Sequence, residues 1–311
     1  AANWTPKLDF TDQTLIYGSY AHGYKAGGAN PPGATLLSFR EGDIGNPIHP
    51  ATFKPEFVDA FELGSKNTLL DGALTVNGDV FYYNYEGYQI SRIVDRTAIN
   101  DNFDAHIKGA ELETSWEPAP GLRFKFAGGY EDARLANGSK SVDLMDRTAG
   151  NSDWMVVRPF ITQASNCILP TYVVAAMIAP SSGPLVSADN VANACGEAYT
   201  LHNDPETQLP YVANPVPTCL PSGVCTHDQY VPPGYPGFDP TTAPNGGQGF
   251  DKDLGGNQLP NAPHFTTSFS AEYSIPISPD WAASLHGDFY WQSQSWARVF
   301  NDDPYDKLRG Y

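Results

Sequence analysis

The sequence predicts an all-β chain in which one antiparallel sheet of about seven to nine strands forms part of a transmembrane β-barrel. Three observations support this prediction. Apolar and polar residues alternate with period two in several long segments, the connections between these segments are alternately very short and very long, and aromatic residues gather near the segment ends. The composition agrees, because 13% of the 311 residues are aromatic and 29 are glycines, which favours strands over helices.

The alternation places each predicted strand. It is clearest in four segments, residues 73–85, 122–131, 265–273 and 281–292. In the second of these, Phe124 and Phe126 fall on one face, whereas Arg123 and Lys125 fall on the other. Weaker alternation runs through residues 14–24, 56–69 and 105–116, and strand stubs are expected at 4–10 and 307–311. The sequence therefore predicts seven complete strands and two stubs.

The connections differ between the two ends of these strands. Short turns rich in Gly, Pro, Asp and Ser lie at residues 70–72, 117–121 and 278–280. The other ends are joined by long segments, residues 25–55, about 90–104 and 135–263. Barrels of outer membranes have short periplasmic turns and long extracellular loops. We therefore expect the short turns to be periplasmic and the long segments to be extracellular.

The aromatic residues fit the same interpretation, because amphipathic rings lie well at the level of lipid headgroups. We expect Trp116, Tyr130, Trp281 and Trp291 to form such girdles. A soluble β-sandwich with a packed core is the alternative, because period two alone does not tell which face meets water. The length of the strands and the difference between their ends favour the barrel.

Composition and motifs exclude several classes of function. The formal net charge is −17, so nucleic acid is not an expected partner. The longest mostly apolar run, residues 172–179, is too short for a spanning helix. The sequence has no Gly-x-Ser-x-Gly elbow, phosphate-binding loop or His-Glu-x-x-His motif. We therefore expect no enzymatic activity and no cofactor.

Four stretches resemble one protein family, the TonB-dependent outer-membrane receptors, particularly those of sphingomonad-like proteobacteria. TLIYGSYAHGYKAGGAN (residues 14–30) resembles a strand and loop of that family, and the long hairpin from FKPEFVDAFELGSKN onward (residues 53–90) resembles its next hairpin. FDAHIKGAELETSW (103–116) and LPNAPHFTTSFSAEYSIP (259–276) resemble two further strands. The resemblance covers about half of the chain, in the expected order.

The resemblance implies a piece of the C-terminal part of a barrel of about 22 strands whose lumen is filled by a plug domain. For the intact protein it implies active uptake of a scarce solute across the bacterial outer membrane, with a ferric siderophore as the default solute. The implied partners are outer-membrane lipid and, through the plug, the TonB–ExbB–ExbD complex. Two alternatives stay open: a passive outer-membrane channel, and a secreted all-β carbohydrate-binding module.

The predicted barrel segments, residues 1–134 and 259–311, flank a long loop, residues 135–258, that holds 14 of the 27 prolines and all four cysteines. The cysteines are Cys167, Cys195, Cys219 and Cys225, and none of their spacings matches a zinc or redox motif. We expect two disulfides outside the cytoplasm. Of three possible pairings, Cys167–Cys195 with Cys219–Cys225 closes the shortest loops. The loop is interpreted either as a ligand-contacting lid or as a solvated decoration.

Eight polar residues are candidates for contact with a solute in the lumen. They are proposed because they alternate with apolar neighbours, or because a histidine or tyrosine could contact a metal chelate. The candidates are Tyr20, His22, His106, Lys108, Glu111, Arg123, His286 and Asp288. The simpler interpretation is that such residues solvate the barrel wall or pair with one another. No protein-bound metal site is expected, since the run NDDPYD (301–306) is better explained as a tight acidic turn than as a calcium site.

Overall fold

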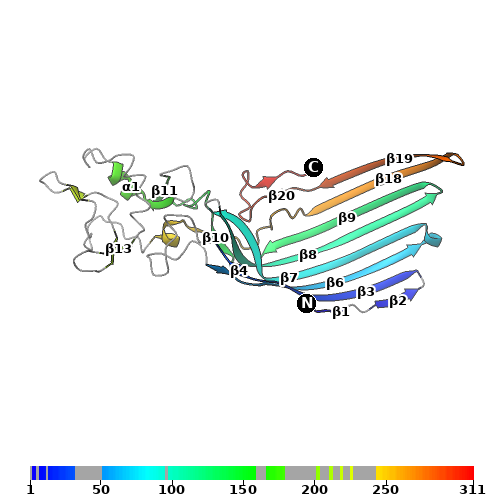
Figure 1. The fold of residues 1–311 in the computed structure, drawn as a ribbon, viewed down its shortest axis with the longest axis horizontal. Helices are drawn as coiled ribbons and strands as arrows, with labels where there is room; N and C mark the ends of the chain where they lie inside the picture. Colours follow the sequence, from blue (N-terminus) through cyan, green and yellow to red (C-terminus); the bar gives the residue numbers. More distant parts are fainter. Residues whose placement is uncertain are drawn as a thin grey trace.

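The computed structural model contains one nine-stranded antiparallel sheet (Figure 1). Its strands lie in the order β1–β3–β6–β7–β8–β9–β18–β19, and β2 also pairs with β3. The structure describes residues 2–4, 7–11, 13–31, 51–94, 97–158, 166–178, 201–203, 210–212, 218–219, 225–226 and 243–311.

The strands occur where the alternation predicts them. They are β1 (Ala2–Trp4), β2 (Lys7–Thr11), β3 (Thr14–Lys25), β6 (Glu56–Leu69), β7 (Leu74–Val94), β8 (Thr97–Ala119), β9 (Leu122–Leu135), β18 (Phe265–Ser278) and β19 (Trp281–Gln292). The predicted all-β antiparallel architecture is therefore confirmed. In this chain the sheet is an open wall, with β1 and β19 at its two ends.

The tight turns all lie at one end of the sheet, on the right in Figure 1. Between β6 and β7 the chain reverses through the short 3₁₀ turn η1 (Leu70–Gly72), in which Leu70 and Asp71 have φ of 52° and Gly72 has φ of 94°. In the β8–β9 turn Gly121 has φ of 78°, and a Cβ atom there would lie 2.3 Å from the carbonyl oxygen of Ser274. Only glycine fits that position without moving the neighbouring strand.

The two faces of the sheet differ in chemistry, as the alternation predicts. The face that we call the apolar face carries Ile16, Leu63, Val80, Leu112, Phe126, Phe269 and Phe289, and all of these side chains are exposed. Phe126, Phe269 and Phe289 are direct register partners on β9, β18 and β19. Phe289 is 57% exposed and Leu63 58%. These phenylalanines therefore lie on an open surface and not in a sandwich core.

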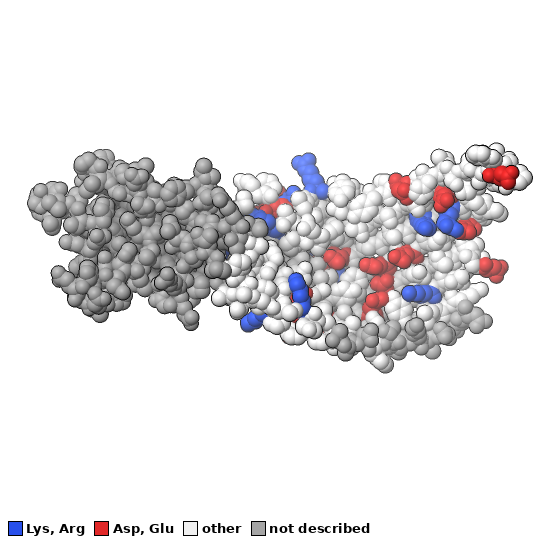
Figure 2. Space-filling model, viewed as in Figure 1, with Lys and Arg blue, Asp and Glu red and all other residues white. Residues whose placement is uncertain are grey.

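The opposite face, which we call the acidic face, carries most of the charged side chains of the strands. Its charged or basic side chains over the middle and tight-turn end of the strands include Glu62, Lys66, Asp79, Glu111, Glu113, Arg123, Lys125, Glu131, Glu272, His286 and Asp288. Figure 2 shows acidic groups gathered over the middle strands of the sheet.

The expectation of a long loop at about residues 90–104 is wrong. The structure continues β7 to Val94 and begins β8 at Thr97, so residues 90–94 and 97–104 belong to strands, and a register shift between Tyr85 and Tyr88 marks where the hairpin leaves the wall. The hairpin extends because Ile99, Phe103 and Ala105 are buried in contacts that local sequence does not show.

Those contacts form a hydrophobic core outside the sheet. Phe103 and Ala105 on β8 pack with Leu254, Leu259 and Val299 from segments far away in the chain. Further members are Ala133, Leu135 and Ala262, with Tyr85, Tyr88, Ile90, Ile107 and Phe300 packed against them. The hairpin and two later segments therefore share one core at the end of the sheet opposite the tight turns.

The remaining elements are short. They are β4 (Gly28–Ala29), β5 (Thr52–Phe53), β10 (Lys140–Val142), β11 (Trp154–Val157), β12 (Cys167–Pro170), α1 (Thr171–Ile178), β13 (Leu201–Asn203), β14 (Pro210–Val212), β15 (Thr218–Cys219), β16 (Cys225–Thr226), η5 (Pro244–Gly247), β17 (Asp251–Asp253), β20 (Ser295–Trp296) and β21 (Lys307–Leu308). In the described part of the chain, no helix has the length and apolar character needed to span a membrane. β10 pairs with β17, so both ends of the 135–258 segment meet at one small stem.

Candidate functional site

The middle of the acidic face brings carboxylates from neighbouring strands together. Asp79 on β7 is the direct register partner of Glu111 on β8. On β6, Glu62 accepts a hydrogen bond from the hydroxyl of Tyr17, with an oxygen–oxygen distance of 2.5 Å. The Tyr17 ring reaches Glu62 across Gly64, where a Cβ atom would lie 2.5 Å from the ring. The wall therefore presents anionic groups that are fixed by packing.

Beside these carboxylates the acidic face is hollowed into a groove of about 460 Å³. Its polar lining from β7, β8, β9, β18 and β19 comprises Thr75, Asn77, Glu113, Ser115, Lys125, Ser268, Ser270, Asp288 and Tyr290. The groove exists because several of its lining side chains are small, and its walls carry hydroxyl, amide and charged groups. This groove is suited to bind a polar solute or a polar protein segment by hydrogen bonds.

Four of the predicted candidates lie on the acidic face. Asp288 lines the groove and accepts from His286, with 2.7 Å between its Oδ2 and the imidazole Nε2. Glu111 lies directly opposite Asp79 on the neighbouring strand. Arg123 forms an ion pair with Glu117 at the tight-turn end of the strands. Of the predicted candidates, Glu111 therefore lies beside the carboxylate of Asp79, and Asp288 lies in the wall of the groove.

The other four candidates lie on the opposite side of the sheet, so the eight candidates do not share one face. His106 and Lys108 differ from Glu111 by odd numbers of residues, so period two places them with Leu112 on the apolar face. Tyr20 and His22 lie on that face too, and both hydrogen-bond to Asp59, with His22 Nδ1 at 2.8 Å and Tyr20 Oη at 2.9 Å from its Oδ1.

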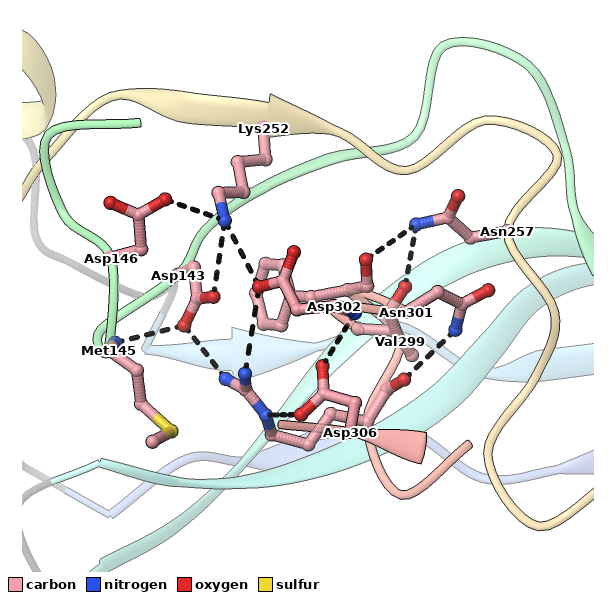
Figure 3. A network of polar contacts seen from close by, with 11 residues as sticks. Asp143, Met145, Asp146, Lys252, Asn257, Val299, Asn301, Asp302 and Asp306 are labelled. Atoms are coloured by element: carbon pink, nitrogen blue, oxygen red, sulfur yellow. Dashed lines mark hydrogen bonds and ion pairs between the residues drawn. The ribbon is translucent and has the colours of Figure 1, made fainter. Parts of the chain in front are cut away.

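A second polar cluster lies at the stem of the 135–258 segment (Figure 3) and has no counterpart among the sequence candidates. Arg298 donates from Nη1 to Asp143 at 2.8 Å and from Nε to Asp306 at 2.5 Å. Lys252 Nζ lies 2.8 Å from Asp146 and 3.1 Å from Asp302, and 3.5 Å from Asp143. No short motif could have revealed this cluster, because its partners are as many as 155 residues apart.

The contacts in this cluster shift the pKa values of Asp143 and Lys252. Burial raises the pKa of Asp143, but hydrogen bonds from Arg298 and from the Met145 N–H outweigh burial and leave the pKa below its ordinary value. Burial lowers the pKa of Lys252, but its contacts with Asp146 and Asp302 outweigh that and raise the pKa overall. Both shifts favour the charged forms of Asp143 and Lys252 at neutral pH.

The cluster also accounts for the acidic turn at 301–306. Asp302 and Asp306 face Lys252 and Arg298, so these carboxylates are neutralised by side chains of the protein. Among the described residues, no group of three or more His, Cys, Asp or Glu side chains is placed to hold a metal ion.

The predicted disulfide pairing concerns residues that the structure describes only in part. Cys167 is buried and disulfide-bonded. Cys195 lies outside the described residues, whereas β15 and β16 place Cys219 opposite Cys225 in the backbone register. The pairing stays a prediction.

Comparison with known proteins gives a family match and a set of distant structural likenesses. A family model described as TonB dependent receptor-like, beta-barrel, matches residues 1–161. The chain is similar to the ferric yersiniabactin uptake receptor FyuA from Yersinia pestis (13% identity, TM-score 0.48) and to two proteins from Acinetobacter baumannii, the siderophore receptor PiuA (15%, 0.47) and the ferric preacinetobactin receptor BauA (12%, 0.46).

Each of these alignments covers 99% of this chain but only 28%, 28% and 27%, respectively, of the solved structure. The chain thus spans less than a third of the length of the structures it resembles. No curated protein matches it.

Proposed function

This chain belongs to the TonB-dependent receptor-like β-barrel family, and from that premise we propose that it forms part of the wall of an outer-membrane receptor that imports a scarce solute. In this proposal the acidic face lines the lumen and the apolar face meets lipid. The partners are the outer-membrane lipid, the solute, and the TonB–ExbB–ExbD complex, which would act through a plug domain in the lumen.

The observation that carries this proposal is the chemistry of the two faces. Exposed apolar side chains such as Leu63, Phe269 and Phe289 cover one face, and charged groups occupy the other. A soluble protein rarely exposes a continuous apolar surface of this kind, whereas the outward side of a membrane barrel requires it. The tight turns at one end and the hairpin and loop core at the other also fit a membrane barrel.

We propose a ferric siderophore as the solute, as the sequence resemblance implies. Glu111 and Asp288, with the groove beside them, are proposed as wall residues that contact the solute or the domain that fills the lumen. The four candidates on the apolar face are not proposed as solute contacts.

For the extracellular loop we propose the disulfides Cys167–Cys195 and Cys219–Cys225. The direct register of the Cys219 and Cys225 backbones supports the second pair, because directly opposed strand positions lie close enough for a disulfide.

Uptake by a deletion strain tests the proposal. The strain should lose growth on at least one ferric chelate in a panel of iron and carbohydrate sources, and the full-length gene should restore it. Dissipating the proton-motive force should abolish accumulation of that chelate by the complemented strain. Accumulation that persists without the proton-motive force would indicate a passive channel, and a protein that stays in solution without detergent would indicate a secreted module.

A further inference from the structure

The sequence contains three Asn-Gly dipeptides, at residues 77–78, 137–138 and 245–246. An asparagine that precedes glycine is prone to lose its side-chain amide, because glycine has no side chain to hinder attack of its backbone nitrogen on the asparagine Cγ. That attack closes a five-membered ring, so the backbone and the side chain must both be free to rotate. The structure gives the three dipeptides very different freedom.

The first dipeptide is held in the middle of the sheet. Asn77 and Gly78 belong to β7, and Gly78 is the register partner of Ser65 on β6 and of Leu112 on β8. Rotation of the backbone at Asn77 would break the hydrogen-bonded ladders on both sides. The strand therefore prevents ring closure at this site.

The third dipeptide is held by hydrogen bonds of the reacting groups themselves. Asn245 Nδ2 donates to the carbonyl oxygen of Gly249 at 2.9 Å and to Oδ1 of Asp251 at 3.0 Å. The N–H of Gly246, which is buried, donates to the carbonyl oxygen of Ala243 at 3.2 Å. The leaving amide and the attacking nitrogen are therefore both fixed.

The second dipeptide, Asn137-Gly138, has none of these restraints. It forms the turn between β9 and β10, at the end of the sheet opposite the tight turns (Figure 1). Both residues are exposed, and a Cβ atom on Gly138 would meet nothing within 4 Å. Within the described ranges, neither the Asn137 amide nor the Gly138 N–H makes a hydrogen bond. The turn also borders an open groove of about 740 Å³, through which water reaches it.

We propose that Asn137 is a site of self-modification, at which the asparagine is converted to aspartate and isoaspartate. The Gly138 nitrogen attacks Asn137 Cγ and forms an N–Cγ bond. The Cγ–Nδ2 bond breaks, and Nδ2 leaves as ammonia with the proton of the Gly138 N–H. Water then opens the succinimide ring. Addition of water at Cγ gives aspartate in the original chain, whereas addition at the backbone carbonyl carbon leaves the chain running through Cγ as isoaspartate.

The new carboxylate would lie beside the stem that β10 and β17 form. A Cβ atom on Gly255, just after β17, would lie 3.1 Å from Asn137 Cα. The Gly255 N–H donates to Oδ1 of Asp253 at 2.9 Å, and Asp253 is the register partner of Lys140. The modification therefore adds a negative charge at the base of the long loop, close to one residue of each sign.

The full-length protein, purified in detergent, tests the proposal by incubation in mildly alkaline water enriched in heavy oxygen. Each converted site takes up one heavy-oxygen atom, which distinguishes conversion during the incubation from earlier conversion. Peptide mapping with electron-transfer fragmentation then measures both products at residues 77, 137 and 245. Asn137 should convert at least about tenfold faster than either of the other two, because a held segment must open before it reacts.

Two controls separate the fold from the local sequence. In protein unfolded in guanidinium chloride, the three sites should convert at rates within about threefold of one another, because the contacts that distinguish them are lost. The variant Asn137→Gln keeps an amide but places it one carbon farther from the Gly138 nitrogen. It should lose the conversion at residue 137 and keep the slow rates at Asn77 and Asn245.

Equal rates at the three sites in the folded protein would overturn the proposal. It would also be overturned if residue 137 stayed unmodified in the folded protein over a time in which the unfolded protein converts there. Conversion of Asn137→Gln at the rate of the unaltered protein would exclude closure of the five-membered ring as the reaction.

Discussion

Arg298 and Asp143 join two segments that lie 155 residues apart, with 2.8 Å between the guanidinium Nη1 and the carboxylate Oδ1. Asp143 is completely buried, and Asp306, the second partner of Arg298, is 2% exposed. The pair fixes the stem formed by β10 and β17 to the segment that follows β19 (Figure 3). Because these carboxylates are buried, removing their cationic partner costs more free energy than breaking an ion pair on the surface.

Replacing Arg298 should release this junction. In Arg298→Gln the buried carboxylates of Asp143 and Asp306 lose their main cation, and removing one partner of a buried pair costs roughly 3 kcal/mol. We expect the opening free energy of the amides of Met145 and Asp302, measured by hydrogen exchange, to fall by about that amount.

The matched control is Lys307→Gln, which removes an exposed pair with Asp303 in the same segment. That change should cost less than about 1 kcal/mol, because exposed pairs contribute little. Equal effects of the two variants would contradict the importance of the buried pair.

Acid should weaken the same junction. The Asp143 carboxylate has a lowered pKa in the folded protein. Its contribution to the opening free energy of the junction is therefore complete above the pKa of an unfolded aspartate, about 3.9. That contribution is lost as the pH falls through the lower pKa of the folded state. Lys252 has a raised pKa, so its contribution is complete below about pH 10.4 and is lost as the pH rises through the folded pKa. Opening free energies at Met145 should therefore be constant from roughly pH 5 to 9, after correction for intrinsic exchange. A slope inside that window would show that another group controls the junction.

A charge on the apolar face should hinder membrane insertion. Phe269→Arg places a guanidinium among Phe126 and Phe289, where lipid is expected, at a cost of roughly 2–4 kcal/mol if the position lies at mid-membrane. The neighbouring change Ser270→Arg places the same charge on the acidic face beside Asp288 and should be tolerated. Folding into liposomes, followed by heat-dependent electrophoretic mobility, measures both variants. If Ser270→Arg proved the more harmful, the assignment of the two faces would have to be reversed.

Gly64 should resist even a small side chain. In Gly64→Ala the methyl group would overlap the Tyr17 ring and separate its hydroxyl from Glu62, with an overpacking cost of about 1–3 kcal/mol. The control is Gly287→Ala on β19, where a Cβ atom meets nothing within 4 Å and no loss of stability is expected. Unfolding in guanidinium chloride compares them, and equal midpoints would mean that the Tyr17 contact contributes no stability.

The cysteine pairing can be read directly from peptides. Digestion of the non-reduced full-length protein should yield one linked peptide with Cys167 and Cys195 and another with Cys219 and Cys225. Mass spectrometry before and after reduction identifies them. A link from Cys167 to either of the two later cysteines would refute the proposed pattern.

The wall could be predicted from sequence because each strand carries its own signal. Period two in segments such as 122–131 decides which side chains share a face, and no distant contact is needed to read it. The same rule could have separated Lys108 from Glu111, since their odd spacing places them on opposite faces.

The extended hairpin and the ion cluster could not be predicted in this way. Residues 97–104 are rich in Asn and Asp and resemble a loop, and they form a strand because Ile99 and Phe103 are buried by tertiary packing. The partners of Phe103 include Leu254 and Val299, which lie more than a hundred residues later. Such contacts depend on the folded topology, and a single sequence carries no local trace of them.

The carboxylates of the acidic face have an electrical consequence. Among the charged side chains named above for this face, seven are acidic and three are lysine or arginine, all within one stretch of wall. Walls of one sign concentrate mobile counter-ions in the water beside them. The water beside this stretch of wall therefore holds more cations than anions, and the excess falls as salt shortens the reach of the fixed charges.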